Sequence, residues 1–180
     1  MISLYSKTSF YFLRHAQTDY NVHNIYNDEH EVELNQVGVE QSLKIQKKMD
    51  SLSIATVCSS PMLRVQQTKK IVLKNKIVQD VVSDHFRECQ STLWRLFIAS
   101  ESRVLTHQEW ELIQTFINQV EIGLQHAFLY EDPLLIIAHG GTYWALSHLL
   151  QLEGSRKIDN CVLVEIYTDP NGFWKIKFIT

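Results

Sequence analysis

Short apolar runs, each followed by a turn and a helical pattern, recur along this chain of 180 residues. Leu134–Ala138 is the clearest of them, and Phe10–Leu13 and Ile54–Cys58 have a similar character. Such runs are typical of parallel strands that are buried on both faces of a sheet. Because strands alternate with helices, the chain is predicted to be an α/β protein, a three-layer α/β/α sandwich with a mostly parallel central sheet. The turn residues Asp169–Gly172 predict a terminal hairpin, and therefore an antiparallel edge strand.

The same patterns locate the individual elements. Strands are expected over 9–13, 54–58, 76–82, 134–138, 161–167 and 173–179. A short helix is expected within 19–33, and longer helices begin near 38, 62, 107 and 143 and end near 51, 73, 130 and 150. Residues 1–8 form a lead-in, and residues 83–106 show no regular pattern.

Apolar spacing predicts which side of the two longest helices is buried. In the helix that ends near 51, these residues are Val39, Leu43, Ile45 and Met49. The helix that begins near 107 starts with a capping box of Thr106 and Glu109. Its expected buried residues are Trp110, Ile113, Phe116, Ile117, Val120 and Leu124.

The amino-acid composition and net charge exclude several classes of protein. With 45% hydrophobic residues the chain can fill one ordinary core, so residues 1–180 are expected to form a single domain. A net charge of −3 argues against a nucleic-acid partner, and no apolar stretch suits a membrane span or a signal peptide. Three scattered cysteines favour reduced thiols in a cytoplasmic protein. No Cys or His cluster has zinc-site spacing, so neither a metal nor a cofactor is expected.

Basic side chains follow three of the predicted strands. Arg14 and His15 follow the first strand, Arg64 lies in the first turn of the helix after the second, and His139 follows Leu134–Ala138. Because parallel strands end at one edge of a sheet, these groups converge if the three strands are neighbours. Two guanidinium groups, two imidazoles and helix N-termini suit a tetrahedral dianion, most naturally a phosphoryl group. Each group taken singly also fits a surface charge or a core histidine.

Four segments of the sequence resemble, in the same order, signature segments of the histidine phosphatase superfamily, a phosphoglycerate-mutase-like family. They are Leu13–Thr18 with Asn21, Leu34–Gln41, Ser59–Thr68 and Ala138–Gly141, with Asn160–Cys161 as a weaker echo. Within this family the chain resembles a short, phosphatase-type member such as the α-ribazole phosphatases.

The resemblance implies hydrolysis of a phosphomonoester through a phosphohistidine intermediate. His15 would be the nucleophile that attacks phosphorus in line. Arg14, Arg64 and His139 would bind the equatorial oxygens and stabilise the added charge of the transition state. The two guanidinium groups and His139 would then supply the positive charge that a metal ion gives in other phosphatases, so no metal is required.

The resemblance also implies a role in substrate binding for other residues of these motifs. Thr18 and Asn21 match positions that bind the phosphoryl group or the nucleophile loop, and Gly140 would let the backbone approach an oxygen. Ala16 replaces the usual glycine, and we expect little effect unless that position needs a positive φ.

The family also implies a carboxyl group as general acid, because an alkoxide is a poor leaving group. Phe86–Glu88, followed by Trp94, resembles the family segment that carries this acid. Glu88 is therefore predicted as the acid and later as the base for the hydrolytic water, with Asp84 as the second candidate. The glycines usual before Trp94 are missing, so this loop is expected to differ in shape.

A cysteine-dependent phosphatase is a competing hypothesis, because Cys58 and Arg64 have Cys-x5-Arg spacing. Such a loop binds phosphate through successive backbone N–H groups, and Pro61 removes one of them. This hypothesis also leaves His15 and His139 without a role.

Two further functions are compatible with the family fold. One is that of a mutase-type phosphotransferase, which generally has a longer segment than the one between Glu88 and Thr106. The second is that of a non-catalytic relative that binds phosphoryl groups without turnover.

The expected partner is a small-molecule phosphomonoester, and its identity and the oligomeric state are left open. Phosphates of sugars, α-ribazole phosphate and phosphohistidine proteins all remain possible substrates. The segment between Cys89 and Gln108 is expected to wall the pocket. Its side chains that could face a ligand are Trp94, Arg95, Phe97 and Arg103.

Overall fold

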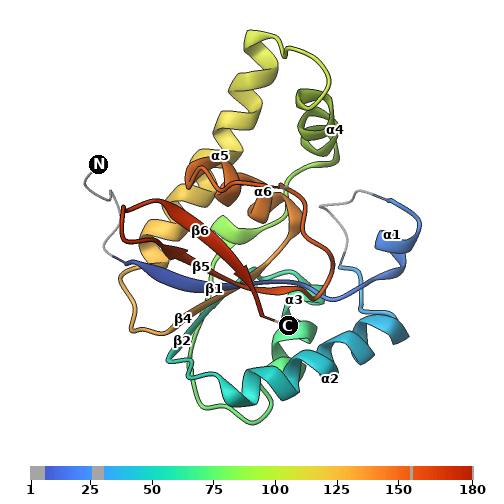
Figure 1. Cartoon of the computed structure of the whole chain (residues 1–180). Coiled ribbons are helices and arrows are strands. Elements are labelled where there is room, and N and C mark those ends of the chain that lie inside the picture. Colours follow the sequence, from blue (N-terminus) through green and yellow to red (C-terminus); the bar gives the residue numbers. More distant parts are fainter. Residues whose placement is uncertain (1–6, 26–30, 155, 180) are drawn as a thin grey trace.

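A computed structural model describes residues 7–25, 31–154 and 156–179 (Figure 1). Its strands are β1 (Ser9–Arg14), β2 (Thr56–Ser59), β3 (Gln79–Val82), β4 (Leu134–Ala138), β5 (Leu163–Thr168) and β6 (Trp174–Phe178). They form one sheet in the order β3-β2-β4-β1-β5-β6. β2 pairs in parallel with β3 and β4, and β4 with β1, whereas β5 is antiparallel to β1 and β6. This confirms the predicted, mostly parallel sheet with an antiparallel edge.

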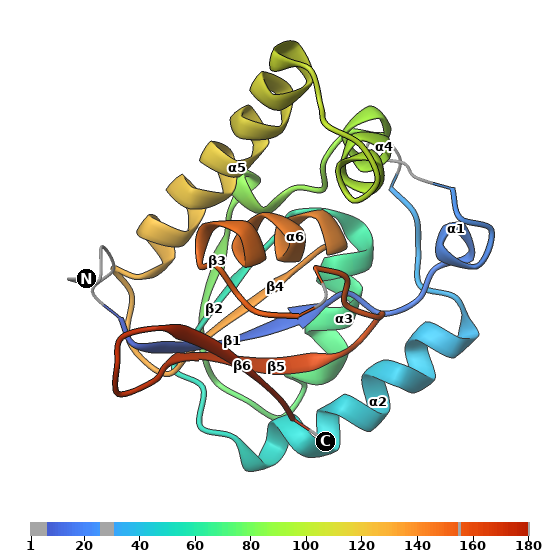
Figure 2. The ribbon, with the colours of Figure 1, turned by 45° about the horizontal axis from the view of Figure 1, so that its top comes forward.

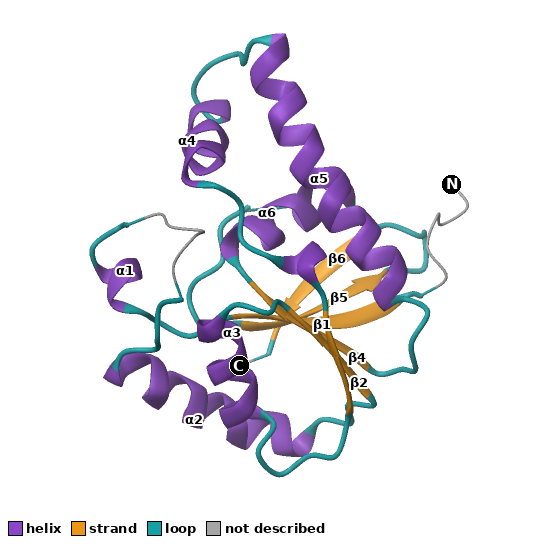
Figure 3. Cartoon of the chain, turned by 180° about the vertical axis from the view of Figure 1, so that it is seen from behind, coloured by secondary structure: helices purple, strands orange, loops and turns teal. Residues whose placement is uncertain are grey.

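The helices cover both faces of this sheet. They are α1 (Asp19–Val22), α2 (Gln36–Ser51), α3 (Leu63–Val72), α4 (Ser91–Ser100), α5 (His107–Ala127) and α6 (Gly140–Leu149), with a 3₁₀ turn η1 (Asp84–Phe86). α2 and α3 lie on one face, and α5 and α6 on the other, while α4 lies beside α5 (Figures 1 and 2). Figure 3 shows the same layers from behind. Most of the predicted lead-in 1–8 and part of 19–33 lie outside the described residues.

Strand β4 explains why the clearest apolar run is apolar throughout. Leu135 and Ile137 belong to the core on the α2–α3 side, whereas Leu134, Ile136 and Ala138 belong to the core on the α5–α6 side. All five are fully buried, because the strand is covered on both faces. Within the described ranges, no helix has both the length and the apolar character that crossing a bilayer requires.

The buried face of α2 differs from the prediction. It consists of Gly38, Ser42, Ile45 and Met49. Val39 and Leu43 are 37% and 48% exposed. The helix is rotated in this way because Gly38 packs directly on the carbonyl of Gln17, where a Cβ would overlap it.

Two expectations near the long helix are also wrong. Trp110 is not a core residue but is 37% exposed, and it lies in the first turn of α5. The start of α5 extends beyond the sheet (Figure 1). The other residues expected in the core from this helix are buried, namely Ile113, Phe116, Ile117, Val120 and Leu124. Residues 83–106 are not irregular but contain η1 and α4. The N-cap of α4, Gln90, makes no side-chain capping bond, so the usual signal for a helix start is absent.

The predicted capping box at the start of α5 can be tested by mutation. The Thr106 hydroxyl accepts the Glu109 N–H, and the Glu109 carboxylate accepts the Thr106 N–H at 2.8 Å. Thr106→Ala should lower the free energy of unfolding, measured by urea denaturation, by about 1 kcal/mol. Thr115→Ala, at an exposed position later in α5, is the matched control and should change it by less than about 0.5 kcal/mol. Equal losses in both variants would refute the capping role.

Candidate active site

The backbone of His15 is held from both sides at the end of β1. Its N–H donates to the carbonyl of Ala138 at 2.9 Å, which extends the pairing with β4. Its carbonyl accepts the N–H of Cys161 and the side-chain amide of Asn160, both at 3.1 Å. The position of the imidazole is therefore fixed by a neighbouring strand and by the turn that precedes β5.

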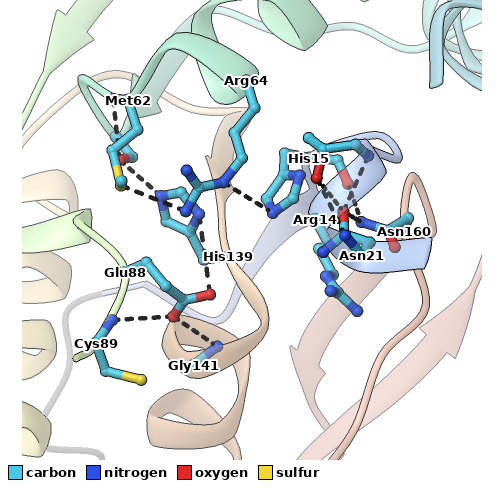
Figure 4. Close-up of polar contacts among 12 residues, drawn as sticks. Arg14, His15, Asn21, Met62, Arg64, Glu88, Cys89, His139, Gly141 and Asn160 are labelled. Carbon is cyan, nitrogen blue, oxygen red and sulfur yellow. Dashed lines mark hydrogen bonds and ion pairs between the residues drawn. The ribbon is translucent and has the colours of Figure 1, made fainter. Parts of the chain in front are cut away.

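The tautomer of His15 follows from its hydrogen bonds. Nδ1 lies 2.8 Å from the carbonyl oxygen of Ala16, which can only accept, so Nδ1 carries the proton. Nε2 then carries the electron pair of the ring, and it accepts the Nε–H of Arg64 at 3.3 Å (Figure 4). His15 thus presents a nucleophilic nitrogen beside a guanidinium group.

Two guanidinium groups border the cavity that His15 faces. Arg14 donates from Nη1 to the carbonyl of Ile158 at 2.6 Å, and Arg64 contacts the sulfur of Met62 at 3.5 Å. Burial, first, and then the charges of Arg64 and Arg14 hold the pKa of His15 well below its usual value. A neutral imidazole between two cations suits an anionic electrophile.

His139 is the N-cap residue of α6 and is completely buried. Its Nε2 lies 2.8 Å from the hydroxyl of Ser60, and its ring lies edge-on to that of His15 with 5.2 Å between centroids. Burial, followed by the charge of Arg64, holds its pKa well below the usual value. Its Nδ1 is 4.0 Å from a carboxylate oxygen of Glu88.

Glu88 is held by backbone N–H groups on the α6 side of the site (Figure 4). Its Oε1 accepts from Cys89 at 3.0 Å and from Gly141 at 3.1 Å. Burial raises the pKa of this carboxyl, although Arg64 opposes the shift. A Cβ on Gly141 would overlap the carboxylate of Glu88 and lie 2.8 Å from the sulfur of Cys89, so the approach requires glycine.

Thr18 and Asn21 form a capping box at the start of α1. The Thr18 hydroxyl accepts the Asn21 N–H, and the Asn21 Oδ1 accepts both the N–H and the hydroxyl of Thr18. Asn160 donates to the same Oδ1 at 3.1 Å. These contacts orient the Asn21 amide at the edge of the cavity. Gly140 also borders the cavity, with the ring edge of Trp94 3.1 Å from where its Cβ would be.

These groups surround a cavity of about 380 Å³. Its wall includes most of the predicted site residues, which are Arg14, His15, Thr18, Asn21, Arg64, Glu88 and Gly140. His139 does not line the cavity but lies behind it, against Ser60 and Glu88. Asp84, the second candidate for the acid, is not part of the wall, and its side chain is 81% exposed and paired with Arg87.

Of the four side chains expected in the pocket wall, only Trp94 lines the cavity. Phe97 stacks on Trp144 in the core, and Arg103 makes a two-pronged ion pair with Glu109. Arg95 is likewise absent from the wall. Ile98 of α4 lines the cavity as well, and further lining residues come from the segments before α2 and before β5.

Ser60 and Asn160 have structural roles that were not predicted. Both lie in segments that resemble the family motifs, but only their contacts with His139 and with His15 reveal what they do. Cys58 lies within β2, where burial raises the pKa of its thiol to about 12, and it does not line the cavity. This position does not suit a cysteine nucleophile.

The arrangement combines an electron-pair donor, two cations and a carboxyl group whose pKa is raised. Together they can bind a tetrahedral anion, attack it and protonate what leaves. In the part of the chain that the structure describes, no three His, Cys, Asp or Glu side chains are grouped to hold a metal ion.

Comparison with known proteins identifies relatives of this chain. The model of the histidine phosphatase superfamily (branch 1) matches residues 10–179. Agropine synthesis reductase of Rhizobium rhizogenes is 27% identical over 80% of this chain, which spans only 35% of that protein. A Hydrogenobacter thermophilus protein that bears the name of a phosphoserine phosphatase is 24% identical over 88% of this chain and 89% of its own length. The α-ribazole phosphatase of Shigella flexneri has the same fold, with a TM-score of 0.69, 18% identity and coverage of 95% of each chain.

The protonation state of the two histidines can be measured. His15 and His139 should remain neutral at about pH 6, and His15 should be the Nδ1–H tautomer, in long-range proton–nitrogen correlation spectra. Because the folded chain binds fewer protons at these groups than the unfolded chain, the free energy of unfolding should fall as the pH drops below about 6.5. An imidazolium at His15 near pH 7 would be inconsistent with this geometry.

Proposed function

The chain belongs to the histidine phosphatase superfamily (branch 1), and we propose that it hydrolyses phosphomonoesters through a phosphohistidine intermediate on His15. One observation carries the assignment of the nucleophile. The carbonyl of Ala16 fixes the proton of His15 on Nδ1, so that the electron pair of Nε2 is available beside Arg64.

In the first step, Nε2 of His15 attacks phosphorus in line as the bond to the leaving oxygen breaks. Arg14 and Arg64 bind the phosphoryl oxygens and stabilise the charge that develops on them. The imidazole becomes cationic on phosphorylation, and its Nδ1–H remains bonded to the Ala16 carbonyl, which stabilises that charge. His139, which is held by Ser60, does not line the cavity and supports His15 and Glu88 from behind.

Glu88 supplies the proton in this mechanism. Its raised pKa favours a protonated carboxyl that can protonate the leaving oxygen. As a carboxylate it then accepts a proton from the water that attacks the phosphohistidine, which releases inorganic phosphate and restores His15. The bonds to Cys89 and Gly141 keep the carboxyl in place in both steps.

The proposed substrate is a small-molecule phosphomonoester, and the proposed location is the cytoplasm. Support for the location comes from the cysteines, because Cys58, Cys89 and Cys161 are all buried and none of the three forms a disulfide.

The nucleophile is tested by hydrolysis of p-nitrophenyl phosphate in the presence of EDTA. The native chain should turn over, and His15→Ala should lower the rate at least about a thousandfold because no covalent intermediate can form. His107→Ala, which replaces a largely exposed histidine on α5, is the matched control and should keep the native rate. Equal rates in the native chain and His15→Ala would exclude His15 as the nucleophile.

The general acid is tested by the choice of leaving group. Glu88→Gln and Gly141→Ala should slow the hydrolysis of an alkyl phosphate at least about a hundredfold, because an alkoxide must be protonated as it leaves. In kcat/KM, which covers the steps up to loss of the leaving group and not the later hydrolysis of the phosphohistidine, p-nitrophenyl phosphate should be affected much less, because its phenolate leaves without a proton. Asp84→Asn is the control and should leave both rates unchanged. If it showed the loss on the alkyl ester instead, Asp84 would be the acid.

A further inference from the structure

Building on the proposed hydrolysis at His15, we propose that the native substrate is a phosphomonoester whose leaving group is uncharged and largely apolar. The observations that carry this inference lie in the outer part of the cavity, away from the reacting nitrogen. We call this part the outer wall, made of Ile25, Val32, Trp94, Ile98 and residues 157–159.

The size of the cavity leaves most of its space to the leaving group. A phosphoryl group occupies the volume of a few water molecules, each about 30 Å³. The cavity measures about 380 Å³. A substrate that fills it therefore extends well beyond the phosphoryl group.

Five apolar side chains line the outer wall, next to the polar Tyr20 and Asn24, and they come from three separate segments. Ile25 follows α1, Ile98 and Trp94 lie on α4, and Ile158 lies in the turn before β5. Ile25 is 48% and Ile98 is 41% exposed, so both present apolar surface to water when the cavity is empty. A leaving group that covers them gains the hydrophobic free energy of that surface.

Trp94 connects this apolar wall to the phosphoryl site. Its ring edge lies over Gly140, at 3.1 Å from where a Cβ would be, and the guanidinium carbon of Arg14 is 3.5 Å from the same point. The atoms of the leaving group nearest to phosphorus would therefore meet an aromatic side chain.

Charge in the outer wall does not favour an anionic leaving group. Among the described residues, Lys157 and Asp159 are its charged members, and their formal charges cancel. The ammonium of Lys157 lies 3.3 Å from the carboxylate of Glu101. A carboxylate on the substrate would compete with Glu101 and would lie near Asp159, and a zwitterion would leave Ile25 and Ile98 uncovered.

The test compares two aryl esters that differ by a single carboxylate, together with one zwitterionic alkyl ester. For the native chain, kcat/KM for phenyl phosphate should exceed that for 4-carboxyphenyl phosphate by at least about tenfold, and that for O-phosphoserine by more. Calorimetric binding of the two aryl esters to His15→Ala measures the preference of the cavity without turnover. Phenyl phosphate should bind this variant about tenfold more tightly.

A designed change of charge provides the matched variants. Ile98→Lys places a cation in the outer wall and should shift the ratio of kcat/KM values toward 4-carboxyphenyl phosphate by about tenfold. Ile122→Lys is the control, because Ile122 on α5 is 43% exposed but does not line the cavity. It should leave the ratio unchanged.

The outcomes separate the two proposals. Tighter binding of 4-carboxyphenyl phosphate or O-phosphoserine to His15→Ala, or a higher kcat/KM for either in the native chain, would overturn the inference about the leaving group. An unchanged ratio in Ile98→Lys would also overturn it. If phenyl phosphate binds more tightly but the native chain hydrolyses no ester, the leaving-group inference stands and the proposed hydrolysis fails.

Discussion

The parallel pairing of β4 between β1 and β2 is the constraint on which the site depends. Arg14 is in register with Ala138, and Ser59 is in register with Ile137. The strands β1, β4 and β2 therefore end at nearly the same level of the sheet, so the residues that follow them lie close together. Because β4 is buried on both faces, a shift of its register would expose or strain an entirely apolar segment, so hydrophobic burial maintains the relative positions of the polar groups.

Burial shifts the pKa values of the site residues in opposite directions, and both shifts favour the proposed hydrolysis. It opposes the charged form of each ionisable group, so it lowers the pKa of His15 and His139 and raises that of Glu88. In the proposed mechanism, the first effect keeps an electron pair of His15 available for attack, and the second keeps a proton of Glu88 available for the leaving oxygen. The two arginines stay charged in any protein environment, and the proposed mechanism uses them to bind the anion.

The sequence patterns predicted the sheet and the groups that contact its edge, because both depend on short-range signals. An apolar run identifies a strand, and the residues directly after it, such as Arg14, His15 and His139, must lie at its end. The patterns did not predict features of the fold that depend on tertiary contacts. Gly38 packs on the Gln17 carbonyl and turns α2 away from the face that Val39 and Leu43 suggested. α4 has no side-chain cap and is stabilised by its contacts with other elements.

The outer wall was the part of the site that the sequence predicted least well. The helix α6 nevertheless fixes the position of this wall relative to the proposed phosphoryl site. α6 begins directly after His139, and its residue Trp144 stacks on Phe97 of α4 with 4.0 Å between ring centroids and an angle of 9°. One turn earlier in α4, Trp94 lies over Gly140, the first residue of α6. Two aromatic contacts along one helix thus hold the apolar wall at a fixed distance from the reacting atoms. If the proposed hydrolysis holds, we expect sequence changes in the exposed part of α4 to alter which alcohol is accepted without moving the groups proposed to act on phosphorus.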